Sequence, residues 1–161
     1  AAAYSLLQDV FAYPVINSSV FFLDDFPSPV PMGNGEYIRK YFGRDISSFY
    51  SNIWWPDMLK IAEKHGVRYT GVVIEDYSER TSGTFPRTTD TERFRYFGGL
   101  LLEKGGEIGI HGYNHMPLCP DGFDFLGKVD YETWPTANDM RSAIAELMDF
   151  TKTLFPKNSA P

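Results

Sequence analysis

The sequence predicts an α/β fold in which parallel strands alternate with helices. Three short apolar segments of strand length are separated by stretches with helical periodicity, in the order strand, helix, strand, helix, strand, helix. This alternation is typical of right-handed βαβ units. Acidic or histidine side chains follow each apolar segment at once. Because α/β proteins bind ligands at the carboxyl ends of their parallel strands, these side chains are expected to meet in one site.

The first predicted strand is the apolar run Ser19–Leu23, which ends at Asp24 and Asp25. An uninterrupted apolar run fits a strand that is buried on both faces. A loop rich in Pro and Gly follows, and then a polar and aromatic stretch over residues 36–53. That stretch is expected to form an ordered excursion over the strand ends.

The first predicted helix begins at Trp55-Pro56-Asp57, because Pro and Asp suit the first helical turn. It ends at His65-Gly66, with glycine as the C-cap. His65 is interpreted as a cation near a helix C-terminus rather than as a metal ligand. The residues expected on the apolar face are Met58, Leu59, Ile61 and Ala62.

The second strand is predicted over residues 67–74 and is followed by Glu75-Asp76, which are interpreted as supporting or solvated side chains. A helix over about 90–104 comes next, and the residues expected to point inward are Phe94, Phe97, Leu100 and Leu101. The third strand covers 107–110. The last helix covers 138–154, with apolar positions at Met140, Ile144, Leu147, Met148, Phe150 and Leu154.

Length and composition restrict the class of protein. A chain of 161 residues with 43% hydrophobic and 16% aromatic content is expected to form one globular domain, over 18–161, after an N-terminal extension over 1–17. The net charge of −6 and the lack of a basic run argue against nucleic acid and anionic membranes as partners. No apolar stretch approaches the roughly 18 residues that spanning a bilayer requires. The single Cys119 excludes an internal disulfide and is not counted as a ligand.

His111 and His115 lie four residues apart just beyond the third predicted strand. Gly112 and Pro117 argue for a strand running into a loop rather than for a helix. Two imidazoles and one carboxylate of the Asp24-Asp25 pair supply three ligands and leave open positions, as in catalytic metal sites. The other carboxylate is then free to act as a general base on metal-activated water. The predicted chemistry is metal-assisted hydrolysis of an acyl group.

An apolar strand that ends in Asp-Asp and is followed about 85 residues later by His-x-x-x-His resembles the polysaccharide deacetylases of the NodB-homology class. The segments Leu-Asp-Asp-Phe-Pro-Ser-Pro and His-Gly-Tyr-Asn-His-Met-Pro-Leu are closer still to an uncharacterised bacterial branch with a deacetylase-like core. The resemblance covers roughly residues 19–155. It implies an irregular (β/α) barrel, usually of seven strands.

The resemblance also implies roles for particular residues. Asp24 would be the catalytic base, and Asp25, His111 and His115 would hold zinc or a similar divalent ion such as cobalt or nickel. The implied activity is removal of N-acetyl groups from an amino-sugar polysaccharide, in an extracellular or cell-surface location. The family usually has Ser or Thr where this chain has Gly112. Its later motifs, an Arg-containing segment and a His that protonates the leaving group, are absent here, so we expect the domain to be truncated and to belong to a larger polypeptide.

Other interpretations stay open at this point. Taken singly, the aspartates could be turn and capping residues, and the histidines could be loop residues bonded to the core; their joint position favours a metal site. A catalytically inactive relative could bind glycan or serve as a scaffold. Two His and one carboxylate also describe non-haem Fe(II) oxygenases, which the strand–helix alternation disfavours.

A metal-free retaining glycosidase is disfavoured because Asp24 and Asp25, as neighbours in a strand, are expected to point to opposite sides. Aromatic and amide side chains are candidates for lining a sugar groove, with core packing as the alternative for each ring. These candidates are Trp54, Trp55, Tyr113, Asn114 and Trp134.

Overall fold

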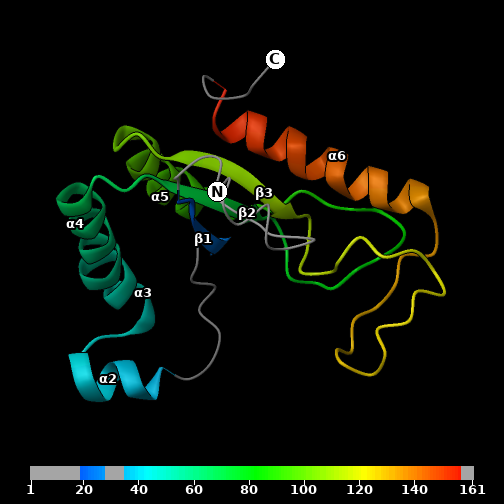
Figure 1. Cartoon of the computed structure of the whole chain (residues 1–161), viewed down its shortest axis with the longest axis horizontal. Coiled ribbons are helices and arrows are strands. Elements are labelled where there is room, and N and C mark those ends of the chain that lie inside the picture. The colour runs from blue at the N-terminus through cyan, green and yellow to red at the C-terminus, as the bar shows by residue number, and fades with distance from the viewer. Residues whose placement is uncertain (1–18, 28–34, 157–161) are drawn as a thin grey trace, which may run out of the picture.

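The structure, a computed structural model, describes residues 19–27 and 35–156 and has a mixed α/β architecture (Figure 1). Its three parallel strands are β1 (Phe21–Phe26), β2 (Tyr69–Ile74) and β3 (Glu107–Gly112), paired in the order β1-β2-β3. The predicted α/β class, with parallel strands and helices between them, is confirmed. The predicted N-terminal extension over 1–17 lies outside the described residues.

Helices connect the strands and follow the last of them. The connection from β1 to β2 contains α2 (Glu36–Phe42), α3 (Ile46–Phe49), the π-helix η1 (Tyr50–Trp54) and α4 (Trp55–His65). Helix α5 (Glu92–Glu103) joins β2 to β3, and α6 (Ala137–Leu154) comes after β3. Figure 1 shows the long loops after β2 and β3 on the same side of the molecule, beyond the carboxyl ends of these strands.

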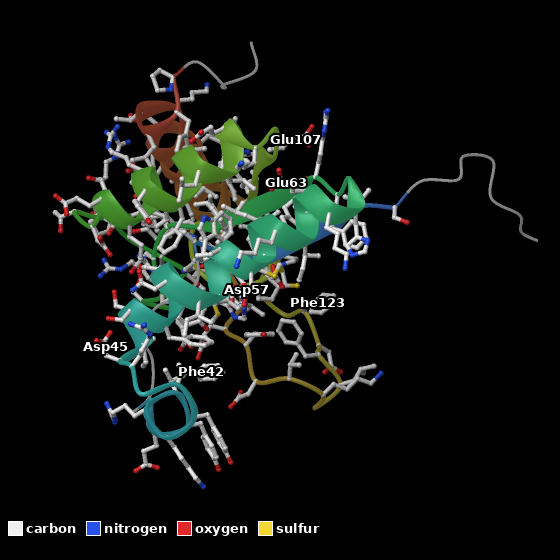
Figure 2. The ribbon with its side chains drawn as sticks, turned by 90° about the vertical axis from the view of Figure 1, so that its left-hand side faces the viewer. Phe42, Asp45, Asp57, Glu63, Glu107 and Phe123 are labelled. Carbon is white, nitrogen blue, oxygen red and sulfur yellow. The ribbon has the colours of Figure 1, made fainter. Side chains whose placement is uncertain are left out.

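The ordered excursion predicted over residues 36–53 is mostly helical, a secondary structure that was not predicted from the sequence. The carboxylate of Asp45 caps α3 by accepting a hydrogen bond of 2.8 Å from the Ser48 N–H. From there α3, η1 and α4 follow one another without a break. In Figure 2 the labels lead upward from Phe42 at the end of α2, through Asp45 at the start of α3, to Asp57 and Glu63 in α4. Asp45, as an N-cap residue, therefore indicated the start of a helix better than the irregular aromatic pattern after it did.

The helices cover one face of the sheet. The core joins Leu23 and Val73 from the strands to buried residues of α5 and α6. These helical residues are Phe94, Phe97, Leu101, Ala143, Leu147, Phe150 and Leu154. On the other face Phe22 is 63% exposed, and it lines an open hollow of about 470 Å³ together with Asp24 and His111. The sheet therefore has a covered face that stabilises it and an open face that leads to the candidate site.

Two residues that were predicted to point inward do not. Ile61 in α4 is 48% exposed and Met148 in α6 is 45% exposed. Both lie at the edge of an apolar stripe, where helical spacing alone does not decide between core and solvent. The end of α4 is as predicted: Gly66 adopts a φ of 64° and its N–H bonds the last turn of the helix, directly after His65.

Candidate metal centre

The two carboxylates of β1 lie in a β-bulge. Between the positions of Leu23 and Phe26, strand β1 has one residue more than β2, and Asp25 has a φ of 51°. The Oδ1 atoms of Asp24 and Asp25 lie 2.8 and 3.7 Å from the same atom, Nε2 of His111. The prediction that these neighbours point to opposite sides is therefore wrong, because a bulge interrupts the alternation of a strand. Strand β1 also continues through the pair, whereas it was predicted to end before it.

A second bulge positions the histidines. Strand β3 extends past its predicted end to Gly112, and His111 is its extra residue relative to β2. Gly112 has a φ of 145°, and a Cβ at this position would lie 2.8 Å from the carbonyl oxygen of Asn114. This conformation turns the chain so that the rings of His111 and His115 have centroids 5.6 Å apart. Steric hindrance therefore explains why this chain has glycine at position 112, where polysaccharide deacetylases usually have Ser or Thr.

Replacing Gly112 by alanine is expected to lower the free energy of unfolding by about 2–4 kcal/mol, because backbone strain and a clash add. The matched control is Gly66→Ala, whose φ of 64° is also positive but where nothing lies within 4 Å of the added Cβ. That control should lose about 1 kcal/mol through strain alone. Urea unfolding in the presence of a chelator measures both. Equal losses in the two variants would show that the contact with Asn114 has no effect.

Asp25, His111 and His115 together form a candidate metal site. Each offers a ligand atom, and these atoms lie within 4.8 Å of one another. Asp25 Oδ1 is 3.7 Å from Nε2 of His111 and 3.6 Å from Nε2 of His115. Tetrahedral zinc with bonds of 2.0–2.1 Å would hold such atoms about 3.4 Å apart. The two distances from Asp25 are close to this value, and all three atoms lie within 4.8 Å of one another.

The surroundings of Asp25 also fit a cation. Its Oδ1 is buried and accepts no hydrogen bond from the residues that the structure describes. A buried carboxylate oxygen without a partner is costly, and a bound cation would remove that cost. Neutral imidazole and carboxylate are ligands that zinc, cobalt and nickel accept. The donor set and its geometry therefore fit a divalent metal.

Asp24 lies beside this triad rather than within it. Its side chain is 74% exposed and its Oδ1 reaches Nε2 of His111 at 2.8 Å. The group of ligand atoms within 4.8 Å of one another does not include it. The structure thus brings all four predicted site residues together and places one carboxylate on the solvent side.

Two tyrosines next to His115 were missed in the sequence analysis. The ring of Tyr77 lies 6.5 Å from that of His115 and nearly parallel to it, and the ring of Tyr131 lies 6.1 Å away at 62°. Burial, followed by the negative charge of Asp25, raises the pKa of Tyr77 to about 12. Its phenol is therefore a neutral hydrogen-bond donor at physiological pH. Tyr77 follows the end of β2 closely, and this position at the shared strand edge was the available signal.

Three of the residues proposed for a sugar groove are buried instead. The side chains of Tyr113, Asn114 and Trp134 are each 1% exposed, so they present no ring face or amide to a ligand at the surface. The Tyr113 hydroxyl donates to the carbonyl of Pro86 at 2.7 Å, which fastens the loop after β2 to the end of β3. Trp54 is half-buried and packs against the core. Core packing, the alternative for these rings, therefore describes them better.

Glu75 was interpreted as a supporting or solvated residue, and solvation is wrong for it. The side chain is 3% exposed, and its Oε1 accepts a hydrogen bond of 3.1 Å from the Thr88 N–H. Its Oε2 has no partner in the described part of the chain. Burial raises the pKa of Glu75 to about 7. The folded state therefore favours the protonated carboxyl group, although the hydrogen bond from Thr88 N–H by itself favours the charged one.

The metal-free protein is expected to lose stability as the pH rises from about 4.5 to 7. The pKa of Glu75 is about 7 in the folded state against 4.5 for the free group, so the unfolded state releases this proton first. Protonated Glu75 contributes its full stabilisation of the folded state below pH 4.5. About 3 kcal/mol of this contribution to the free energy of unfolding is lost by pH 8.

Glu75→Gln should remove this difference, whereas the exposed control Glu103→Gln should follow the wild type. Urea unfolding in chelator between pH 4 and 8 provides the comparison. A wild-type curve parallel to that of Glu75→Gln would contradict the assignment.

The fold and the site define a class: a mixed α/β protein with a candidate metal centre of two imidazoles and a carboxylate at the carboxyl edge of a parallel sheet. The chain belongs to the bacterial family described as "Uncharacterised protein conserved in bacteria (DUF2194)", whose model matches residues 1–161. Comparisons with curated proteins and with solved structures gave no match.

Within residues 19–27 and 35–156, no helix is long and apolar enough to cross a membrane.

Proposed function

We propose that this protein is a metal-dependent hydrolase that removes N-acetyl groups from an amino-sugar polysaccharide. The observation that supports this most strongly is the buried Asp25 Oδ1, which lies 3.6 and 3.7 Å from two imidazole nitrogens and has no hydrogen-bond partner among the described residues. A second, exposed carboxylate, Asp24, stands next to it. Three ligands plus a free carboxylate is the combination that metal-assisted amide hydrolysis requires.

The roles of the residues follow from their positions. Asp25, His111 and His115 would hold the metal, for which zinc is the first choice and cobalt or nickel the alternatives. When bound, the metal lowers the pKa of water and polarises the amide carbonyl. Asp24 accepts a proton from the attacking water as its oxygen bonds to the acetyl carbon. The C–N bond then breaks, and Asp24 returns the proton to the departing amine, which leaves acetate and a free amino sugar.

The arrangement of the sheet is compatible with the barrel that this function would use. The strands pair in sequential order, and the core formed by the described residues lies between the sheet and the helices α4, α5 and α6. Doubly wound sheets instead have helices on both faces and an order that reverses. A sequential parallel sheet with one open face is what a section of a (β/α) barrel looks like. We therefore propose that these strands belong to such a barrel.

A polymer substrate also favours an extracellular or cell-surface location.

Two other enzyme classes fit less well. A retaining glycosidase places its carboxyl groups on either side of the scissile bond, whereas Asp24 and Asp25 both approach Nε2 of His111. A non-haem Fe(II) oxygenase could use the same triad. The parallel sheet with crossover helices differs from the β-sandwich barrels that are general in that class.

Acetate release tests the proposal. The zinc-loaded protein is incubated with N-acetylglucosamine oligomers of defined length, and acetate and the free amines are quantified together. We expect equal amounts of both products, which disappear on treatment with a chelator and return with zinc. Stoichiometric zinc without acetate would contradict the hydrolase and favour the inactive glycan-binding or scaffold alternative.

A further inference from the structure

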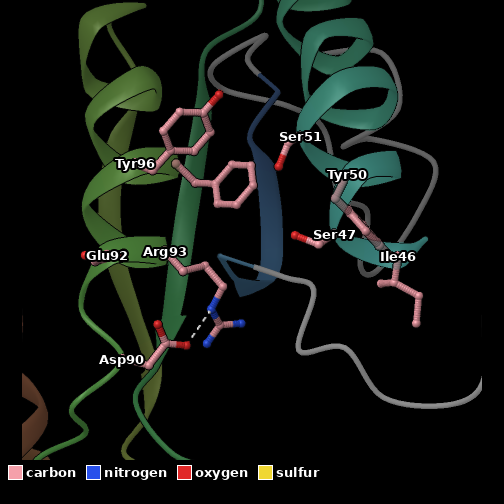
Figure 3. A pocket seen from close by; sticks show the side chains of 9 residues that line it. Ile46, Ser47, Tyr50, Ser51, Asp90, Glu92, Arg93 and Tyr96 are labelled. Carbon is pink, nitrogen blue, oxygen red and sulfur yellow. Dashed lines mark ion pairs between the residues drawn. The ribbon is translucent and has the colours of Figure 1, made fainter. Parts of the chain in front are cut away.

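A cavity of about 500 Å³ lies between helix α5 and the segment formed by α3 and η1 (Figure 3). This volume is typical of small-molecule sites. Arg93 and Tyr96 of α5 form one wall, and Ser47 and Ser51 lie across from them. Ser51 belongs to η1, a π-helix, and such segments are rare and are often found at functional sites.

Polar groups from both walls converge on this cavity. In Figure 3 the guanidinium of Arg93 extends from α5 into the space, and the hydroxyls of Ser47 and Ser51 point toward it from the other side. Arg93 Nε lies 3.3 Å from Asp90 Oδ2. This nitrogen is buried and makes no hydrogen bond with the described residues. The Arg93 side chain as a whole is 22% exposed, so a ligand in the cavity would contact the outer end of the guanidinium.

The lining indicates the chemistry of the ligand. Tyr96, Phe97 and Tyr50 supply aromatic surface, which suits the C–H face of a sugar ring. Two carboxylates, Asp90 and Glu92, outnumber the one guanidinium in the lining. That balance disfavours a phosphate or carboxylate ligand. Aromatic surface combined with serine hydroxyls and an acid–guanidinium pair suits a neutral ligand with many hydroxyl groups.

The cavity also has a connection to the metal centre. Phe97 lines the cavity and packs on Trp55 with ring centroids 5.7 Å apart, and Trp55 packs at 5.9 Å on Phe26, the residue after Asp25. We propose that this cavity binds a neutral sugar unit of the polysaccharide, next to the unit whose acetyl group is at the metal. This inference rests on the proposed function and adds a substrate-binding site to it.

Binding in the presence of a chelator tests the cavity separately from catalysis. The probe is the tetramer of N-acetylglucosamine, titrated by calorimetry into the metal-free protein. Tyr96→Ala should weaken binding about tenfold, and Arg93→Gln about tenfold or more. The matched control is Tyr41→Ala on α2: Tyr41 is 67% exposed against 53% for Tyr96, and it does not line the cavity. It should bind the tetramer like the wild type. Circular dichroism checks that each variant is folded.

The outcomes separate the two proposals. Weaker binding in both cavity variants, with none in the control, would support the sugar site. Wild-type affinity in folded Tyr96→Ala and Arg93→Gln would overturn it, and so would a wild-type protein that does not bind the tetramer at millimolar concentration. Neither result bears on zinc binding or acetate release, so the hydrolase proposal would stand or fall by its own assay.

Discussion

Replacing His111 or His115 by alanine is expected to weaken zinc binding about a thousandfold, equivalent to about 4 kcal/mol. Each variant removes one of three ligand atoms that lie within 4.8 Å of one another. Each variant would keep only Asp25 and one imidazole as zinc ligands. A site with two protein ligands binds zinc weakly. Competition with a chromophoric chelator measures the dissociation constant over this range.

The control for this experiment is His65→Ala. His65 is exposed at the end of α4 and is not among the residues of the metal group. It should bind one zinc ion with wild-type affinity. If all three variants retained zinc equally, the metal would be bound elsewhere and the assigned centre would be wrong. A loss in His65→Ala alone would contradict the assignment more directly.

Asp24→Asn is expected to lower the rate of acetate release by about a hundredfold to ten-thousandfold while zinc stays bound. The amide has nearly the same shape as the carboxylate, but it cannot accept the proton of the attacking water. Because Asp24 stands outside the triad and is 74% exposed, its replacement should leave the ligand geometry intact. Rate and zinc content are measured on the same preparation.

The matched control is Asp57→Asn, an exposed aspartate in the first turn of α4 whose carboxylate contacts Lys60. It should have the wild-type rate and zinc content. A loss of zinc in Asp24→Asn would mean that Asp24 is a ligand rather than the base. Full activity with zinc bound would remove Asp24 from the mechanism.

Patterns with a simple period predicted the fold well. The three strands and the helices α4, α5 and α6 were located within a few residues of their observed bounds, because each has an apolar run or stripe with clear end signals. Helices α2, α3 and η1 were not predicted. Their many aromatic residues pack partly against each other, as Phe42 and Phe49 do at 4.6 Å, so no single apolar stripe is visible in the sequence.

The candidate site was predicted by residue but not by geometry. The order of the strands was enough to bring Asp24, Asp25, His111 and His115 to one edge. Two bulges and a positive φ at Asp25 then decide which way the side chains point. Such irregularities have no periodic signature, so they could not be read from the chain.

The burial of aromatic side chains was the other reason why predicted site residues were wrong. Tyr113 and Trp134 are of residue types that often line sugar-binding surfaces, yet each is buried in the core. An aromatic residue beside a predicted site can face either the ligand or the core, and the sequence does not distinguish the two. Arg93 and Tyr96, which line the cavity, were not predicted as site residues. They belong to an amphipathic helix with no unusual sequence feature.

Diffraction at the zinc absorption edge tests the central claim most directly. A crystal of the zinc-loaded protein should show one anomalous peak within about 2.0–2.2 Å of Asp25 Oδ1 and of Nε2 of His111 and His115. Asp24 should stay outside that bonding distance. An anomalous peak at any other place, or none between these three side chains in a crystal of protein that binds zinc stoichiometrically, would contradict the metal centre and the hydrolase built on it.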